Sequence, residues 1–289
     1  MLKLPTLTKT AVAVLVAAIA GSGAYAADRI SDFSLVDADG RFFQLSRHSN
    51  QDAIVLFAYD ADSRDARLAV SDLNDIAEQF ADQTVEIAVI EVTGATDKTA
   101  LREEAADEDI AFRILMDETQ LVTTELGIPR AAEVAIVDPE SREVIYRGAL
   151  SSRHAEGSRS ERNAGSYVSE ALTAIVAGAE LPENLVASKG DEIDFSAKMA
   201  IENSVSYAND IAPILEQRCV TCHQEGGIAP FAMNNHQMIQ GWSPMIRETL
   251  ITKRMPPGQI DSEYADTFHG VNHITIEETQ KLISWIDNG

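Results

Sequence analysis

Apolar and polar positions alternate in blocks along the first 180 residues of the chain. Two runs of strand length, 53–59 and 85–92, are almost entirely apolar, as in strands that are buried on both faces of a sheet. Between them, residues 63–82 repeat apolar side chains at helical spacing, which predicts a helix. Further strands are expected at 110–117 and across 133–148, helices at 96–107, 119–127 and 166–178, and a hairpin at 33–45. Strands that alternate with helices predict an α/β layer structure.

The pattern changes after residue 180. Residues 181–205 contain proline, glycine and charged side chains without periodicity, which predicts an interdomain linker. The rest of the chain is helical in pattern, with Pro213 in a tolerated first turn and a capping box that starts a last helix at Thr275. We therefore expect an α/β domain over 27–180, a linker, and an all-α domain over 206–289.

The first 26 residues have the features of a cleaved signal peptide. Lys3 and Lys9 give a positively charged start, a short apolar core follows, and an Ala-x-Ala cleavage site ends at Ala26. The alternative is a retained membrane anchor, although the apolar run is short for a bilayer span. We therefore expect an exported protein that loses residues 1–26 and has no stable membrane span afterwards.

The chain is strongly acidic, with a formal net charge of −23 at pH 7. Binding of nucleic acid needs a basic surface, so this class of partner is excluded. An acidic surface instead favours solubility and electropositive partners. Arg247, Lys253 and Arg254 form a small basic cluster, which is interpreted as either a docking patch or an ordinary solvated surface.

The two cysteines, Cys219 and Cys222, are spaced as Cys-x-x-Cys. Such a pair can form a redox-active disulfide, supply half of a zinc site, or attach haem covalently when His follows directly. A structural zinc site needs roughly four ligands, and the three downstream histidines lack the paired spacing of a zinc finger. These are His236, His269 and His273. A redox pair normally lies where a strand meets a helix N-terminus, whereas this pair ends a predicted helix.

Haem attachment fits the motif best. The two thiols would bond to the haem vinyl groups, and His223, directly after Cys222, would bind the iron from one side. Export agrees with this chemistry, because c-type haem is attached outside the cytoplasm. The sequence therefore predicts one covalent haem c, with Cys219 and Cys222 as thioether anchors and His223 as an axial ligand.

The sixth iron ligand decides between electron transfer and small-molecule chemistry, because a thioether closes the distal position. Met255 stands directly before two prolines, and proline disfavours helix at the preceding residue. Met255 is therefore expected on an extended loop that can reach a metal, or else as an ordinary loop residue that covers the core. Met245 falls in an amphipathic helix and is expected to pack. The other candidates are Met233, Met238, His269 and His273.

Residues 205–289 resemble a bacterial class-I-like cytochrome c domain. The likeness rests on a helix that leads into CVTCH, followed by APF, Met-Pro-Pro and a closing WIDNG helix. The resemblance implies a haem c that is ligated by His223 and, at the matching position, by Met255. It also implies that the helices at 209–218 and 275–287 cross to support the haem.

Residues 30–180 resemble the redoxin branch of the thioredoxin fold, in layout and in stretches such as IVLFAYDADSRDARLAVSDL. The loop after 53–59 has no cysteine, and Ala131-Ala132 stands where a redoxin usually has a cis-proline. Without a thiolate there is no nucleophile for peroxides or disulfides, so we expect a degenerate redoxin that serves as a scaffold or docking module. Three acidic residues of the loop form either a metal site or a solvated helix start: Asp60, Asp62 and Asp65.

The expected function is periplasmic electron transfer by a monohaem cytochrome c domain fused to a cysteine-free redoxin-like domain, rather than enzymatic turnover. The expected partners are redox proteins of the periplasm. The resemblance adds a copper monooxygenase-like oxidase as a separate partner. The alternatives are a peroxidase-like haem enzyme, a thiol-disulfide oxidoreductase, and a redox or gas sensor.

Overall fold

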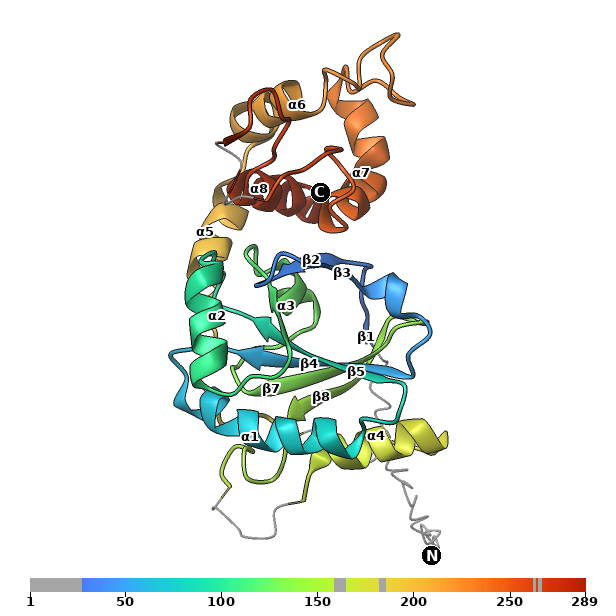
Figure 1. The fold of residues 1–289 in the computed structure, drawn as a ribbon. Helices are drawn as coiled ribbons and strands as arrows, with labels where there is room; N and C mark the ends of the chain where they lie inside the picture. The colour runs from blue at the N-terminus through green and yellow to red at the C-terminus, as the bar shows by residue number, and fades with distance from the viewer. Residues whose placement is uncertain (1–27, 159–164, 182–185, 262–263, 265–266) are drawn as a thin grey trace, which may run out of the picture.

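The structure, a computed structural model, describes residues 28–158, 165–181, 186–261, 264 and 267–289. The expected signal peptide lies outside the described residues. Figure 1 shows two lobes, one built around a sheet by the N-terminal part of the chain and one built from helices by the C-terminal part. No helix in these ranges is long and apolar enough to cross a membrane.

Among the described residues, an eight-stranded sheet forms the centre of the first domain, in the order β1-β8-β7-β4-β5-β6-β2-β3. The strands are β1 (Asp28–Arg29), β2 (Ser34–Asp37), β3 (Phe42–Gln44), β4 (Ala53–Tyr59), β5 (Val85–Glu91), β6 (Arg113–Met116), β7 (Glu133–Asp138) and β8 (Glu143–Ala149). β4 pairs in parallel with β5 and antiparallel with β7. Every residue of β4 is buried, which explains its uninterrupted apolar sequence. β2 and β3 form the expected hairpin.

Helices cover both faces of this sheet (Figure 1). α1 (Arg64–Gln79) and α4 (Tyr167–Ala177) lie below the sheet in the figure, whereas α3 (Leu121–Glu125) lies between the sheet and the helical lobe. α2 (Lys98–Asp107) stands at the side, and a short 3-10 helix, η1 (Leu45–His48), precedes β4. Alternate β4 side chains enter two separate cores, since Val55 packs with the α1 side and Leu56 with the opposite side. The predicted α/β layer structure is confirmed.

The C-terminal region is helical, as the sequence predicts. It contains α5 (Ser196–Ser204), a π-helical turn η2 (Tyr207–Ile211), α6 (Ala212–Arg218), α7 (His236–Ile251) and α8 (Ile276–Asn288). Pro213 lies in the first turn of α6, where its missing N–H costs no helical hydrogen bond. The capping box is present: the Thr275 side chain accepts from the Glu278 N–H, and the Glu278 carboxylate accepts from the Thr275 N–H.

The two lobes share one hydrophobic core. Val122 of α3 and Leu250 of α7 belong to the same cluster of buried side chains. Arg247 of α7 adds a polar link, because it donates to the Ser31 hydroxyl (2.9 Å) and pairs with Glu125 (3.5 Å). Arg247 therefore faces the first domain and does not contribute a free surface charge to the basic cluster that the sequence suggested.

The segment predicted as a linker makes regular contacts with the first domain. We call residues 186–194 the strap. Isolated β-bridges join Arg130 to Glu192 and Ala155 to Ser188, and α5 follows directly after the strap. The sequence pattern did not reveal this structure, because pairing through the main chain needs no side-chain periodicity. α5 also lacks a clear apolar face, since its Met199 is 54% exposed.

Candidate functional site

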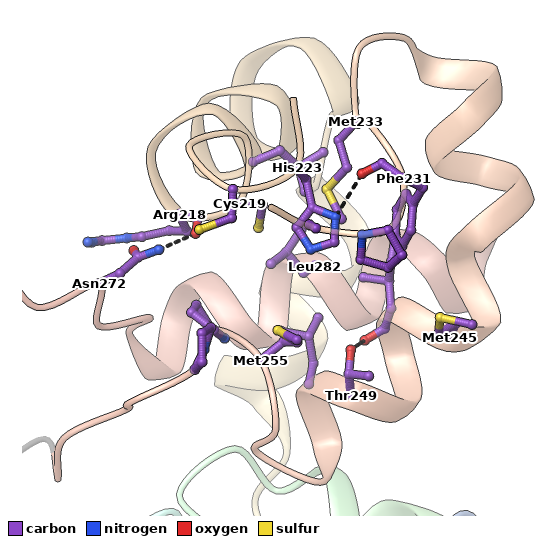
Figure 2. A pocket seen from close by; sticks show the side chains of 18 of the residues that line it. Arg218, Cys219, His223, Phe231, Met233, Met245, Thr249, Met255, Asn272 and Leu282 are labelled. Atoms are coloured by element: carbon purple, nitrogen blue, oxygen red, sulfur yellow. Dashed lines mark hydrogen bonds between the residues drawn. The ribbon is translucent and has the colours of Figure 1, made fainter. Parts of the chain in front are cut away.

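A cavity of about 310 Å³ lies in the helical lobe between the turn that ends α6 and the helix α7. Figure 2 shows its lining side chains, most of which are apolar. The lining residues are Leu215, Arg218, Cys219, Cys222, His223, Ile228, Ala229, Pro230, Phe231, Met233, Met245, Ile246, Thr249, Leu250, Met255, Pro256, Pro257, Asn272 and Leu282. The structure thus brings together the four residues that the sequence analysis singled out as haem ligands and anchors.

The two cysteines lie on one turn at the end of α6. The Cys219 N–H donates to the Leu215 carbonyl (2.9 Å), and the Cys219 carbonyl accepts from the Cys222 N–H (3.2 Å). Neither cysteine forms a disulfide. Burial, with a smaller contribution from Glu278, raises the pKa of the Cys219 thiol to about 11. This thiol is therefore neutral near pH 7, and both thiols are available to a group in the cavity.

His223 is held in a defined orientation by the loop that follows it. Its side chain is largely buried, and its Nδ1 lies 3.0 Å from the Phe231 carbonyl oxygen. A carbonyl oxygen can only accept, so in the neutral ring this contact places the proton on Nδ1 and the lone pair on Nε2. Figure 2 shows the ring pointing into the cavity. A neutral imidazole with one fixed nitrogen and one free nitrogen is the form that ligates a metal.

The loop from 224 to 231 is pinned on both sides. The Ala229 N–H donates to the Cys222 carbonyl (3.1 Å). A Cβ at Gly227 would lie 2.4 Å from the same carbonyl oxygen, so only glycine fits this approach. Phe231 stacks on Trp242 of α7, with ring centroids 4.5 Å apart and planes inclined by 13°. The loop that orients His223 is thus fastened to the helix on the far side of the cavity.

Met255 lies just after α7, on the opposite side of the cavity from His223 (Figure 2). Its N–H donates to the Thr249 carbonyl (3.1 Å), and its carbonyl accepts from the Gln259 side-chain amide (2.7 Å). The side chain is 40% exposed. The loop position expected for this residue is confirmed, and its sulfur is a neutral, soft donor at the cavity wall.

Two further methionines line the same cavity. Met233 is buried, and its N–H donates to the His223 carbonyl (2.8 Å). Met245 is 46% exposed and also lines the cavity, although its helical setting suggested a packing role. Met238 is not among the lining residues. Three methionine side chains therefore line the cavity, and the sequence pattern gave a specific reason to expect only Met255 there.

The histidines that the sequence left as alternative ligands lie elsewhere. His236 packs edge-on against Tyr207, with ring centroids 4.4 Å apart. His273 lines a different cavity, and His269 is exposed. Within the described ranges, no group of three or more His, Cys, Asp or Glu side chains is arranged to hold a metal ion.

Arg218 and Asn272 close one side of the cavity, and neither carried a signal in the sequence. Arg218 forms two-pronged hydrogen bonds with Glu278 at 3.1 Å, which ties α6 to the start of α8. The Asn272 side-chain amide donates to the Arg218 carbonyl. The long sequence separation of these partners explains why periodicity could not find them.

The cavity fits a covalently held haem in its chemistry. Its walls are apolar, two thiols stand on one rim, and a neutral imidazole and a thioether face each other across it. Ile228 at the rim is 91% exposed, so a flat ligand larger than the enclosed volume has room to extend towards solvent. The unmatched Nε2 of His223 supplies the metal-binding atom that such a group requires.

The loop after β4, where a redoxin would carry its thiol, makes polar contacts within itself and to the strap. Asp60 accepts from the Asp62 N–H (2.9 Å), and Asp65 pairs with Lys189 (3.5 Å). The Ser63 hydroxyl is buried and donates to the Asp191 carboxylate (2.7 Å). The acidic loop is thus a helix start that is bonded to the strap.

The strap passes beside this loop and bonds to the segment that leads into β7. The Ala131 N–H donates to the Asp191 carbonyl (2.9 Å), and the Ile193 N–H donates to the Pro129 carbonyl (3.0 Å). A Cβ at Gly190 would lie 1.9 Å from the Ala131 carbonyl oxygen, so the strap approaches as closely as only glycine permits. Ala132, which follows, has a φ of +59°. The strap therefore lies against the loop where a redoxin would carry its thiol.

Comparison with known proteins assigns the first domain. Residues 26–149 match the AhpC/TSA family. The first domain is a thioredoxin-like redoxin domain of this family. The match ends at residue 149, so it leaves the helical region without an assignment. No curated protein matches the chain.

Several solved structures match part of the chain at low identity. A hypothetical protein from Sinorhizobium meliloti 1021 is 21% identical over 58% of this chain and 92% of its own, with a TM-score of 0.47. Peroxidoxin BcpB from Mycobacterium tuberculosis is 22% identical over 43% of this chain and 84% of its own, with a TM-score of 0.37. The thioredoxin domain of a thiol-disulfide oxidoreductase from Bacteroides vulgatus is 14% identical over 41% and 86%, with a TM-score of 0.36.

Proposed function

We propose that this protein is a periplasmic electron carrier that holds one haem c in its helical lobe, beside a redoxin domain that lacks thiol chemistry. The observation that carries the proposal is the convergence of Cys219, Cys222, His223 and Met255 on one apolar cavity. Three of these residues come from a five-residue motif, and the fourth reaches the cavity from a loop more than thirty positions away.

The residues of the cavity have separate roles in this proposal. Cys219 and Cys222 would anchor the haem through thioether bonds to its vinyl groups. His223 would hold the iron through Nε2, while the Phe231 carbonyl accepts from its Nδ1–H. Met255 would supply its sulfur to the iron. The haem supplies reversible one-electron chemistry at its iron, and the apolar walls favour a raised reduction potential.

The redoxin domain serves as a scaffold or docking module in this proposal. Both cysteines of the chain lie at the haem cavity, so the domain has no thiol for peroxide or disulfide chemistry. The net charge of −23 favours an electropositive redox partner. A periplasmic copper monooxygenase-like oxidase is the partner class that the cytochrome resemblance suggests.

The proposal is tested by producing the full chain in the periplasm of a host that attaches c-type haem. We expect one haem per chain that survives denaturing electrophoresis, shown by haem-dependent peroxidase staining of the gel. The double variant Cys219→Ala, Cys222→Ala should lose this stain entirely. Met238→Leu, outside the cavity wall, is the matched control and should retain it. Haem that is released on denaturation of the unaltered protein would contradict the proposal.

One observation favours a second candidate, a peroxidase-like enzyme or gas sensor. Met255 is 40% exposed, so the protein does not fully bury its side chain. A small molecule that displaced it would find an open iron site. Carbon monoxide separates the two functions, because an electron carrier with a bound Met255 binds it slowly after reduction and an open site binds it at once.

A further inference from the structure

The loop that follows Met255 is the part of the helical lobe that reaches the redoxin domain next to the haem cavity. A second cavity, of about 440 Å³, separates this loop from the β2–β3 hairpin and from α2. Residues 258–261 line it on the helical side, and Phe42 and Lys98 line it on the redoxin side. Leu250 lines both cavities, so the two share a wall.

Lys98 connects the loop to the redoxin domain by a buried ion pair. Its side chain is only 7% exposed, and its ammonium group pairs with the Asp261 carboxylate, which is 24% exposed. A buried lysine needs such a partner because an unpaired charge in this environment is strongly unfavourable. Lys98 stands in the first turn of α2, and the Asp97 side chain caps that helix by accepting from the N–H groups of Thr99 and Ala100. The cation is thus fixed on a rigid element.

The backbone around Met255 is held on both sides. Upstream, the N–H groups of Arg254 and Met255 both donate to the Thr249 carbonyl at the end of α7. Downstream, the Gln259 amide donates to the Met255 carbonyl, and the Asp261 ion pair follows two residues later. The upstream hydrogen bonds are made within the helical lobe, whereas the downstream ion pair is made with the redoxin domain.

From this arrangement we infer that the redoxin domain clamps the Met255 loop onto the haem cavity through the Lys98–Asp261 ion pair. Lys98 is then a positioning residue for the thioether, acting through Asp261. The inference rests on the proposed haem function, and it gives the thiol-free redoxin domain a task that requires no chemistry of its own. Loss of the ion pair should let Met255 leave the iron more often.

The test uses the oxidised, haem-loaded full chain titrated with imidazole, which competes with Met255 for the iron. Lys98→Met keeps the length of the side chain and removes its charge. We expect imidazole to bind this variant at least about tenfold more tightly. This corresponds to a tenfold shift in the equilibrium between bound and released Met255, towards release. The near-infrared sulfur-to-iron band should weaken in parallel. Lys98→Arg keeps the charge and should restore most of the unaltered behaviour.

The matched control is Lys281→Met. Lys281 pairs with Asp210 (3.4 Å) and Glu277 (2.8 Å) inside the helical lobe and does not contact the loop, so its imidazole affinity should stay unchanged. Asp261→Asn removes the same ion pair from the other side, and it serves if Lys98→Met does not fold. It should reproduce the tenfold effect.

The outcomes separate this inference from the proposed function. A sulfur-to-iron band in the unaltered protein, with equal imidazole affinity in Lys98→Met or Asp261→Asn, overturns the clamp and leaves the electron-carrier proposal standing. Covalent haem without that band overturns Met255 as ligand and the clamp with it. Absence of covalent haem overturns the proposed function itself.

Discussion

The candidate redox sites of the two domains differ in whether they leave room for a ligand. In the redoxin domain, the strap covers the end of β4 and bonds to Ser63 and Ala131. In the helical lobe, a cavity of about 310 Å³ stays between α7 and the turn that carries the two thiols. The first site is hydrogen-bonded to another segment of the same chain, whereas the second has an open cavity with two thiols and an imidazole nitrogen that has no hydrogen-bond partner among the described residues.

The two sites differ because one contains backbone polar groups that need partners, whereas the other has mainly apolar walls. Backbone N–H and C=O groups in the segment before β7 need partners, and the strap supplies them at Pro129 and Ala131. An external peptide would find those groups already paired. In the cavity the walls are mainly apolar, so burial of a large apolar ligand is the favourable event there. The difference supports redox chemistry in the helical lobe and a structural role for the redoxin domain.

Gly190→Ala tests the close contact between the strap and Ala131. Of the substitutions considered, we expect it to have the largest effect on stability. The added Cβ would lie 1.9 Å from the Ala131 carbonyl oxygen, so the strap must move away. Forced overpacking and loss of the strap's hydrogen bonds should together lower the free energy of unfolding by about 3 kcal/mol. Urea denaturation measures this loss, and limited proteolysis should show faster cleavage within the strap.

Gly241→Ala is the control for this change. Gly241 lies inside α7, and no neighbouring atom stands within 4 Å of the position that an alanine Cβ would occupy there. Alanine should raise the free energy of unfolding by about 0.5–1 kcal/mol because it favours the helix. Equal stability of Gly190→Ala and the unaltered protein would show that the strap is not pressed against Ala131, and the contrast between the two sites would fail.

The burial of the Cys219 thiol in the cavity can be tested by its reactivity in protein made without haem. Burial raises the pKa of this thiol from 9.0 to about 11, so at pH 8 the reactive thiolate is about 100-fold scarcer than in the unfolded chain. Alkylation by iodoacetamide, followed by mass spectrometry, should therefore be about 100-fold slower in native than in denaturing buffer.

The same shift makes the stability of the haem-free protein depend on pH. The folded-state pKa of Cys219 is the higher one, so its contribution is fully present below pH 9.0 and is lost as the pH rises through about 11. Equal alkylation rates in the folded and unfolded chain would mean that the cavity does not bury the thiol.

The sequence predicted the parts of the molecule that depend on local pattern. The apolar run of β4, the capping box at Thr275 and the Cys219–His223 motif are short and carry their own signal. The same holds for Met255, because the prolines after it favour a loop. These features indicated the α/β layers, the helical lobe and the four residues that meet at the cavity.

The missed features all depend on contacts between distant segments. The strap pairs through its backbone, which leaves no periodicity in the side chains. The Lys98–Asp261 pair joins residues 163 positions apart, and neither residue is unusual in its own neighbourhood. The sequence predicts a packing role for Met245, because helical spacing cannot distinguish a face that lines a cavity from one that packs against a neighbour.

A smaller loss of stability than that of Gly190→Ala is expected for the contacts that frame the cavity. Glu278 both caps α8 and pairs with Arg218, so Glu278→Ala should lower the free energy of unfolding of the helical lobe by about 1–2 kcal/mol. Glu277→Ala, one residue earlier, removes only a surface pair with Lys281 and should cost about 0.5 kcal/mol or less. Thermal unfolding of the two haem-free variants measures the difference. If both lose the same stability, Arg218 does not tie α6 to α8, and the ion pair does not fix the position of the thiol-bearing turn.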